Sequence, residues 1–475
     1  MTSEELKELI EETVKAMLAE GRALPAEDSA LPEPQDASWL FDSVDQAVPA
    51  AGKAYLELAE LSMEKRGELV SAMRNAAIAA AEPLARLAHE ETGYGVTAHK
   101  VAKNLLAAHK TPGTEDLHSE AFSGDFGLTL VERAPYGVIG AITPSTNPTS
   151  TIISNAISMV AAGNAVVFNP HPAAKRAAAE TLRALNDAIC AAGGPQNLLC
   201  TIKDPTPDTG QAVMEHRDIP LLVVTGGEAV VKIAMRVGKK VIAAGPGNPP
   251  VIVDDTAIIP KAAKHIVDGA SFDNNVLCVA EKEVFVYRSV AEKLMSEMEN
   301  NGAYRVTDEE ASRIVETVFL RQNGQLSVNR DFVGKSASYI LEQSDVMGGR
   351  GARLIIADVD ETHPFVRTEM LMPVLGIVKV QSDIENAVRM AILAENGCRH
   401  TAIMHSQDVG NLSLAARALN TTIFVKNAPS FSGLGYDGEG FATFTIATPT
   451  GEGLTSAKSF TRSRRCVLRD GFRIV

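Results

Sequence analysis

Hydrophobic positions along much of this chain follow two alternating spacings, and their order predicts strands separated by helices. Short, nearly continuous apolar runs alternate with longer segments in which apolar residues recur every three or four positions. The runs that predict strands are Val138–Ile142, Ala165–Phe168, Leu198–Ile202 and Leu221–Val224; the segments that predict helices are Ser150–Ala161, Ala173–Ala192, Asp208–His216 and one that begins at Glu228. Strands that alternate with amphipathic helices are typical of a parallel sheet covered on both faces. The sequence therefore predicts an α/β fold, and it contains no internal repeat of solenoid period.

Other elements flank this region. Two Ala-rich helical patterns precede it, Val44–Leu61 and Arg66–Thr92, and the second is interrupted by Pro83. Leu128–Ala134 alternates as a strand does, and the apolar stretch Glu283–Tyr287 predicts a further strand in the second half of the chain.

The first 18 residues form a separate amphipathic unit. One apolar stripe at helical spacing faces acidic residues on the opposite side, and it consists of Leu6, Leu9, Ile10, Val14, Met17 and Leu18. Ser3 is a suitable N-cap, and acidic residues in the first turn favour the helix dipole. Residues 19–36, which carry several prolines, predict a flexible linker. Such a helix either docks on a partner or folds back on its own subunit, and we expect docking.

Composition agrees with a large enzyme of a reducing compartment. It has 475 residues, of which 45% are hydrophobic, and no segment approaches the roughly 18 uninterrupted apolar residues of a membrane-spanning helix. The beginning of the chain lacks the basic start and apolar stretch of a secretory signal. Five cysteines (190, 200, 278, 398 and 466) without CxxC spacing indicate reduced thiols, not disulfides or a metal site. We therefore expect a cytoplasmic protein with no metal.

The net charge of −14 argues against binding to nucleic acid. Half of it lies in residues 1–36, where ten acidic residues outnumber three basic ones. An acidic surface repels phosphate backbones. The arginines near the C-terminus, among them Arg462, Arg464 and Arg465, lie in a tail that also contains Val, Leu and Ile, which favours a strand edge with subunit contacts.

Cys278 is the strongest candidate for covalent chemistry. It follows short polar residues in the run Ser271–Ala280, and it precedes a predicted strand. A loop thiol can attack an aldehyde carbon, and an amide donor such as that of Asn147, in the loop Thr143-Pro144-Ser145-Thr146-Asn147-Pro148, can hold the developing oxyanion. The alternative for a lone cysteine is a small buried hydrophobic residue.

A nucleotide site is expected at the carboxyl ends of the parallel strands. Thr225-Gly226-Gly227 lies at one of these ends, just before a predicted helix, where glycines allow a diphosphate to approach backbone N–H groups. The chain has no G-x-G-x-x-G motif, and Gly245-Pro246-Gly247 runs into prolines that prevent a helix from starting there.

Five motifs in one order carry a resemblance to a known family. They are Ala134-Pro135-Tyr136-Gly137-Val138-Ile139-Gly140, the Asn147 loop, Val224-Thr225-Gly226-Gly227, the Cys278 segment and Thr368-Glu369-Met370-Leu371-Met372-Pro373-Val374. From about residue 37 to the C-terminus, the chain resembles the aldehyde dehydrogenase superfamily. It is most similar to the CoA-acylating branch, the propionaldehyde and acetaldehyde dehydrogenases packaged in bacterial microcompartments.

The resemblance implies a fold and a division of the chain. The expected fold has a Rossmann-like cofactor domain (37–123 and 138–250), an α/β catalytic domain (251–458) and a small β oligomerisation arm (124–137 and 459–475). Residues 1–18 resemble the encapsulation peptides of microcompartment cargo enzymes and imply a shell or cargo protein as partner. A homo-oligomer, a dimer or tetramer, inside a bacterial microcompartment is implied as well.

The resemblance also implies roles for individual residues. Cys278 is implied as the nucleophile and Asn147 as the oxyanion donor, Glu369 binds the nicotinamide ribose, and the other cofactor contacts are Thr143, Pro144, Ser145, His171, Thr225, Gly226 and Gly227. The family typically has a lysine where this chain has Asn169, which leaves NAD against NADP open, although the acylating branch favours NAD. His400 is a candidate base for the CoA thiol, or else a histidine bonded to backbone in a turn.

The reaction subtype follows from one position. Hydrolytic members have a glutamate that activates water, and this chain has alanine there, at about Ala243, which can neither accept a proton nor orient a water. The expected reaction is oxidation of a short aldehyde, with propanal preferred over acetaldehyde, using NAD and CoA to give acyl-CoA. The alternatives are a hydrolytic aldehyde dehydrogenase that gives free acid and an inactive microcompartment scaffold.

Overall fold

The computed structural model describes residues 38–322 and 324–475, and these divide into two compact units. Unit 1 contains residues 92–100 and 245–440; unit 2 contains 38–91, 101–244 and 441–475. Both units are α/β, as the sequence predicts. The predicted helix 1–18 and linker 19–36 lie outside the described residues.

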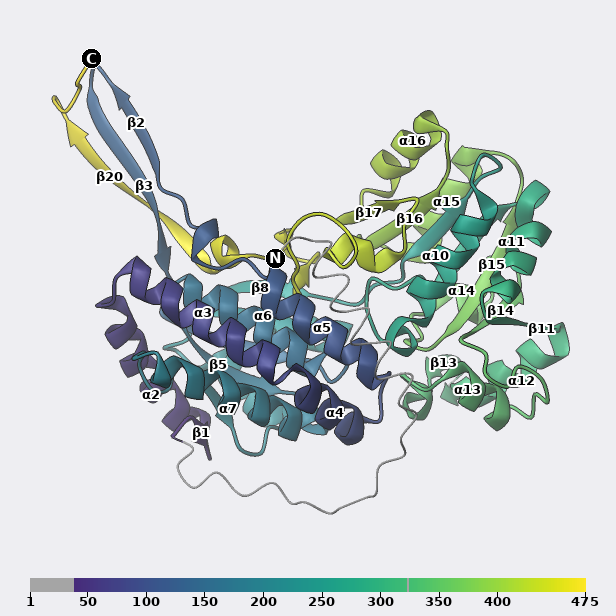
Figure 1. Ribbon diagram of the computed structural model, residues 1–475, viewed down its shortest axis with the longest axis horizontal. Coiled ribbons are helices and arrows are strands. Elements are labelled where there is room, and N and C mark those ends of the chain that lie inside the picture. Colours follow the sequence, from purple (N-terminus) through teal and green to yellow (C-terminus); the bar gives the residue numbers. More distant parts are fainter. Residues whose placement is uncertain (1–37, 323) are drawn as a thin grey trace. The chain divides into compact units, whose positions relative to one another are not determined.

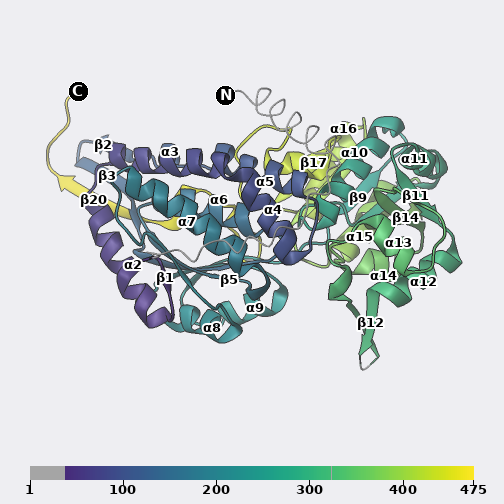
Figure 2. The same ribbon diagram turned by 60° about the horizontal axis from the view of Figure 1, so that its bottom comes forward.

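Unit 2 is built on a six-stranded parallel sheet with strand order β1-β6-β5-β4-β7-β8. The strands are β1 (Leu40–Phe41), β4 (Val138–Thr143), β5 (Ala165–Pro170), β6 (Leu199–Ile202), β7 (Leu221–Thr225) and β8 (Lys240–Ala244). Its helices are α2 (Val44–Ala59), α3 (Met63–Ala79), α4 (Ala81–Thr92), α6 (Pro148–Ala161), α7 (Lys175–Ala191), α8 (Pro207–Glu215) and α9 (Glu228–Ala234), and α5 (Thr97–Lys110) starts in unit 1 and ends here. Figure 2 shows α3, α6 and α7 on one face of the sheet and α8 and α9 on the other.

Burial explains why these strands were predictable. Every residue of β5 and all but one of β4 are buried, because helices cover both faces of the sheet. Helix α6 is buried along its whole length, which its run of apolar and small residues permits. One helix boundary was predicted wrongly: the break between α3 and α4 falls at Ala80, and Pro83 lies in the first turn of α4, where its missing N–H costs nothing.

An antiparallel arm extends from unit 2 (Figure 1). It consists of β2 (Glu120–Gly124), β3 (Gly127–Pro135) and β20 (Thr461–Arg469), in the order β2-β3-β20. All nine residues of β20 pair with β3, from Thr461 opposite Pro135 to Arg469 opposite Gly127. The side chains of β20 after Thr461 are exposed.

Unit 1 contains a seven-stranded parallel sheet with the order β11-β14-β15-β10-β9-β16-β17. The strands are β9 (Pro250–Val253), β10 (Glu283–Tyr287), β11 (Ala303–Val306), β14 (Leu354–Asp358), β15 (Val374–Val380), β16 (Thr401–His405) and β17 (Ile423–Lys426). The helices are α10 (Ile259–Ser271), α11 (Arg288–Asn300), α12 (Asp308–Val318), α13 (Ala337–Gln343), α14 (Pro364–Arg367), α15 (Ile384–Glu395) and α16 (Val409–Leu419). One buried cluster includes Ile314, Ile355 and Phe365, and another includes Ile252 and Phe285.

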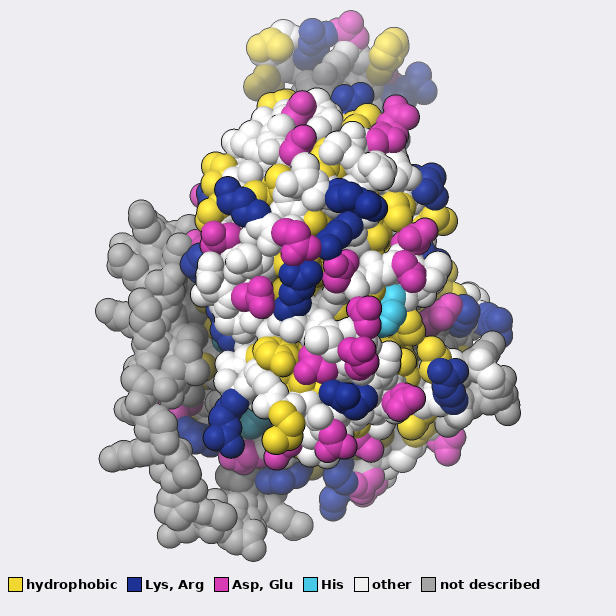
Figure 3. Space-filling view, turned by 90° about the vertical axis from the view of Figure 1, so that its right-hand side faces the viewer, with side chains coloured by type: hydrophobic (Ala, Val, Ile, Leu, Met, Phe, Trp, Pro, Cys, Tyr) yellow, Lys and Arg dark blue, Asp and Glu magenta, His cyan; other side chains and the backbone are white. Residues whose placement is uncertain are grey.

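Two short hairpins complete the described part: β12 (Phe319–Gln322) with β13 (Gln325–Val328) in unit 1, and β18 (Ile446–Ala447) with β19 (Gly453–Leu454) in unit 2. In the described residues, no helix is long and apolar enough to cross a membrane. On the face shown in Figure 3, acidic and basic side chains are interspersed. In unit 1, for example, Glu292 accepts from Arg305 and Lys379, and these bonds lower the pKa of Glu292 to about 2.

Candidate functional site

Cys278 lies in the loop between α10 and β10 of unit 1. Its neighbours from Asn275 to Ala280 are all buried, whereas Cys278 itself is half-buried. The loop therefore presents this sulfur while the surrounding side chains are packed. Three other cysteines differ: Cys200 is buried in β6, where burial raises the pKa of its thiol, and Cys190 and Cys466 lie exposed on α7 and β20, whereas Cys398 is half-buried like Cys278.

A sharp turn precedes the nucleophile candidate. Asp273, Asn274 and Asn275 all have positive φ, at 49°, 52° and 67°. Non-glycine residues rarely adopt this conformation, so three in succession must be held by the surrounding structure. Asp273 is held by contacts from residues 92–100, the segment of unit 1 that precedes the main part of the unit by almost 150 positions.

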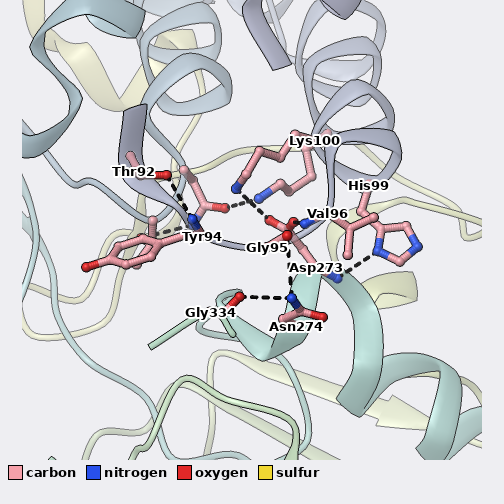
Figure 4. Close-up of polar contacts among 12 residues, drawn as sticks. Thr92, Tyr94, Gly95, Val96, His99, Lys100, Asp273, Asn274 and Gly334 are labelled. Atoms are coloured by element: carbon pink, nitrogen blue, oxygen red, sulfur yellow. Dashed lines mark hydrogen bonds and ion pairs between the residues drawn. The ribbon is translucent and has the colours of Figure 1, made fainter. Parts of the chain in front are cut away.

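Figure 4 shows how this segment holds the turn. The Asp273 carboxylate accepts from the Val96 amide at 2.7 Å and from Lys100 Nζ at 3.1 Å, and both charged side chains are buried. The backbone N–H of Asp273 donates to His99 Nδ1 at 2.9 Å, and Asn274 donates to the Gly334 carbonyl at 2.9 Å. A buried pair of this kind is costly to break because one charge would remain unpaired.

Glu369 and His400 both lie close to Gly247. The Gly247 amide donates to Glu369 Oε1 at 3.2 Å. A Cβ at Gly247 would lie 2.9 Å from the carbonyl oxygen of Cys278 and 2.9 Å from Cγ of His400, so only glycine fits between them. Burial raises the pKa of Glu369, and Lys282 and the Gly247 amide oppose this shift. Unit 1 thus brings Cys278, Glu369 and His400 around one glycine.

His400 is buried and neutral at physiological pH. Burial, together with the charge of Lys282, lowers its pKa to about 4. Nδ1 lies 2.9 Å from the Thr401 hydroxyl, and Nε2 has no hydrogen-bond partner among the described residues. The backbone N–H of His400 donates to Glu395 at 3.0 Å. A neutral imidazole with an unpaired nitrogen can accept a proton.

Asn147 lies in unit 2, at the N-terminus of α6. Its side chain makes no capping hydrogen bond to that helix. Instead, Oδ1 accepts from the buried Lys103 of α5 at 2.6 Å, which leaves the Nδ2 group as a donor; Nδ2 also lies 3.3 Å from the Thr146 hydroxyl. Lys103 therefore fixes which end of the amide can face a reacting oxygen.

The predicted cofactor residues of unit 2 follow strand ends. Strand order runs outward from β4 to β5 and β6 on one side and to β7 and β8 on the other, so the topological switch lies between β4 and β7. Thr143 ends β4 and Thr225 ends β7, and ligands of such sheets bind beyond these ends. Pro144 and Ser145 follow Thr143 and are half-buried.

One buried atom at the switch point is compatible with a ligand there. The hydroxyl of Thr143 is buried and has no hydrogen-bond partner among the described residues. Gly226 and Gly227 follow Thr225, and a Cβ at Gly227 would meet no atom within 4 Å, so this backbone is open to approach. The hydroxyl of Thr225 is paired with Thr445 at 3.1 Å, and His171 is exposed after β5, where Nδ1 accepts from the Ala173 amide.

The structure therefore places the predicted residues in two groups. Cys278, Glu369 and His400 belong to unit 1, and Asn147, Thr143, Pro144, Ser145, His171, Thr225, Gly226 and Gly227 belong to unit 2. Sequence reasoning missed Lys100, Lys103, Asp273 and Lys282, which are all buried and charged. For Lys100 and Lys103 the sequence did contain a signal, because both lie in the segment 98–108, which is otherwise rich in Ala and Leu. In the described residues, no group of three His, Cys, Asp or Glu side chains is suited to a metal ion.

Comparison with known proteins gives a consistent result. The model of the aldehyde dehydrogenase family matches residues 25–435. The acetylating acetaldehyde dehydrogenase of Salmonella typhimurium is 47% identical over 471 residues, which cover 98% of this chain and 99% of that protein. A propionaldehyde dehydrogenase from the Clostridium phytofermentans fucose utilisation bacterial microcompartment has a TM-score of 0.90 and 47% identity, over 92% of this chain and 100% of that one. The Rhodopseudomonas palustris propionaldehyde dehydrogenase with bound CoA and an acylated cysteine has a TM-score of 0.88 and 47% identity, over 91% and 98%.

Proposed function

The chain belongs to the aldehyde dehydrogenase family, and from this premise we infer that it is a CoA-acylating aldehyde dehydrogenase. It converts a short aldehyde, a nicotinamide adenine dinucleotide and CoA to acyl-CoA and the reduced dinucleotide. The observation that carries this conclusion is near full-length similarity to acylating relatives, one of which has bound CoA and an acylated cysteine.

Cys278 is the proposed nucleophile. Its sulfur forms a bond to the aldehyde carbon, and the carbonyl oxygen becomes an oxyanion. The Nδ2 group of Asn147 donates to that oxygen, since Lys103 occupies the other end of the amide. Bound nicotinamide supplies the two-electron oxidant, and the acyl group is then carried on Cys278 as a thioester.

The proposed fate of this thioester depends on Ala243, which replaces the glutamate base of hydrolytic members of the family. Ala243 is buried in β8, opposite Val224 of β7, and its methyl group cannot activate water. The thioester therefore persists until the thiol of CoA attacks it, because a thiolate is an intrinsically good nucleophile. His400 is the proposed acceptor for the CoA proton, and its unpaired Nε2 supports this role.

For the dinucleotide, we propose a site at the switch point of unit 2, and we propose Glu369 as the residue that binds the nicotinamide ribose. Thr143, with its unpaired hydroxyl, and the open backbone of Gly227 are suited to a ligand. Glu369 is anchored through Oε1, which leaves Oε2 for a ribose hydroxyl. NAD is the proposed form. Asn169 accepts from the Thr209 hydroxyl at 2.7 Å and offers no cation for the 2′-phosphate of NADP.

The aldehyde and the cellular location are further proposals. Propanal is the proposed preferred substrate, with acetaldehyde also accepted, in line with the names of the relatives. We propose that residues 1–18 direct the enzyme to a microcompartment in the cytoplasm, where a shell or cargo protein binds them, because a structural relative comes from such a compartment. Fusing residues 1–36 to a fluorescent protein tests this idea: punctate fluorescence is expected in cells that make the shell, and diffuse fluorescence contradicts it.

The central experiment measures aldehyde-dependent formation of NADH with and without CoA, for a series of aldehyde chain lengths. We expect a single burst of NADH without CoA, followed by a slow phase, and fast turnover once CoA is added. Cys278→Ala should abolish both phases while dinucleotide binding persists. Fast steady turnover to free acid without CoA identifies a hydrolytic enzyme, and the absence of a burst with every aldehyde indicates a scaffold.

A further inference from the structure

Lys282 is a buried lysine four positions after Cys278, and the mechanism above gives it no role. All its side-chain hydrogen bonds go to one short stretch of chain. Nζ donates to the carbonyl oxygens of Asn275 at 3.0 Å and Leu277 at 3.3 Å, and to Oδ1 of Asn275. An ammonium has three protons, so these three acceptors satisfy it completely.

These acceptors belong to the part of the chain that sets the position of Cys278. Asn275 is the last of the three residues with positive φ, and Leu277 immediately precedes the cysteine. The side-chain amide of Asn275 in turn donates, through Nδ2, to the carbonyl oxygens of Ala270 at 2.8 Å and Glu281 at 3.0 Å. Lys282 and Asn275 thereby join the chain on both sides of Cys278 into one closed set of hydrogen bonds.

The backbone of Lys282 is itself anchored. Its N–H donates to the Pro249 carbonyl at 3.0 Å, and strand β10, which begins one residue later, pairs with β9 and β15 in the middle of the sheet. The ammonium therefore reaches the loop from a residue whose backbone is held beside the middle of the sheet of unit 1.

The charge of Lys282 also affects the titratable groups around it. The titratable groups that interact with it are Cys278, Glu281, Glu283, Glu369 and His400. Burial lowers the pKa of Lys282, and Glu369 and Cys278 are the largest opposing influences. Burial raises the pKa of Glu281 to about 7 and that of Glu283 well above its usual value, so these two neighbours contribute less negative charge at neutral pH. Attraction between two groups is mutual, so the ammonium favours the thiolate of Cys278 and the carboxylate of Glu369.

We propose that Lys282 is a positioning residue for Cys278, which fixes the backbone of the nucleophile loop and stabilises the thiolate through its charge. The proton of the thiol leaves to solvent, and the thiolate is the form that attacks the aldehyde. This inference rests on the proposed role of Cys278, but its test measures the alkylation of the Cys278 thiol directly.

The test compares Lys282→Met, which keeps the length and removes the charge and donors, with Lys282→Arg, which keeps the charge. The rate at which iodoacetamide alkylates Cys278 in the full-length protein is followed by peptide mass spectrometry from about pH 5 to about pH 10, since only the thiolate reacts. Cys190 and Cys466, which are exposed, serve as internal references. We expect the alkylation midpoint of Cys278 to rise by about one pH unit in Lys282→Met, which means about tenfold less thiolate at neutral pH. Lys282→Arg should recover part of this shift, and the reference cysteines should not move.

An unchanged midpoint in Lys282→Met, or equal midpoints for the Met and Arg variants, overturns the charge effect. Asn275→Leu provides a second test that leaves Lys282 in place and removes one of its acceptors. Its turnover should fall about tenfold or more, as expected for a misplaced nucleophile, while the alkylation midpoint stays near that of the parent. Turnover equal to the parent overturns the positioning role, whether or not the Lys282 variants fold. Cys278→Ala with parental turnover would instead overturn the proposed function.

Discussion

At the scale of single residues, the side chain of Asn147 affects both catalysis and stability. Although it begins α6, it makes no capping bond, but it accepts from the buried ammonium of Lys103, so Asn147→Ala should lower the unfolding free energy by about 1–3 kcal/mol. Turnover should fall about a hundredfold to a thousandfold, the usual effect of removing one oxyanion donor. Lys103→Met should lower it about tenfold, because the amide is then free to rotate.

Stopped-flow measurement of the NADH burst checks this prediction, since the burst isolates acylation. Lys53→Met, on the exposed face of α2, is the matched control and should retain the parental burst. A parental burst rate in Asn147→Ala would remove this residue from the site.

His400 predicts a pH dependence of stability. Its pKa is about 4 in the folded protein and about 6.5 in an unfolded chain, so between these values the unfolded chain binds more protons at this position. The unfolding free energy should therefore decrease as the pH falls through this window, by up to about 3 kcal/mol from His400. His400→Gln should reduce this slope in urea titrations at several pH values. Equal slopes for the variant and the parent would contradict the pKa assigned to His400.

The sequence predicted site residues of one kind and missed those of another. Cys278, Asn147 and Glu369 lie in short motifs whose polar residues interrupt apolar surroundings, and their roles stay predictions. Lys103 and Lys282 were missed because they are buried, whereas a lysine in a helix or next to a strand is usually exposed. Only the fold shows that Lys103 donates to Asn147 and that Lys282 donates to Asn275.

At the scale of elements, the segment 92–100 and the turn 273–275 behave as one structural element. Gly95 has a φ of +71°, and a Cβ there would lie 2.0 Å from the Asp273 carboxylate. Gly95→Ala should therefore cost about 3 kcal/mol or more, because the added methyl group must displace a buried charged pair. Gly397→Ala is the matched control in the same unit, with a φ of +76° and no atom within 4 Å, and it should cost only about 1 kcal/mol of backbone strain. The urea midpoints of the two variants test this prediction. Equal losses of unfolding free energy in Gly95→Ala and Gly397→Ala would show that the contact with Asp273 is unimportant.

Element prediction succeeded where burial is uniform. Strands β4, β5 and β7 are covered on both faces, so continuous apolar runs marked them to within two residues. It failed at the break between α3 and α4, where the helical pattern continues through Ala80 and Pro83 is tolerated in a first turn. No local pattern revealed that 92–100 belongs with residues beyond 245, since that grouping depends on contacts remote in sequence.

At the scale of the whole molecule, the arm predicts how subunits associate. Strand β20 pairs along all of β3 yet exposes Val467 and Leu468, so we expect the arm to make contacts between subunits in a dimer or tetramer. Removal of residues 461–475 should leave the edge of β3 unpaired, and the protein should dissociate or aggregate. Light scattering after size-exclusion chromatography measures the molar mass. Removal of 471–475 alone, beyond β20, is the control, and an unchanged molar mass in the longer deletion would show that the arm does not join subunits.

The pairing of β3 with β20 also has a consequence for biosynthesis. Pro135 and Thr461 are neighbours in the arm but roughly 330 positions apart in the chain. A ribosome that adds about 5–20 residues per second needs on the order of half a minute to make the partner of β3, and all of residues 245–440 emerges in between. The nascent chain therefore carries an open strand edge throughout this interval. The sheet can be completed only once β20 has been made, which makes the hairpin of β2 and β3 the expected binding site for a chaperone during synthesis.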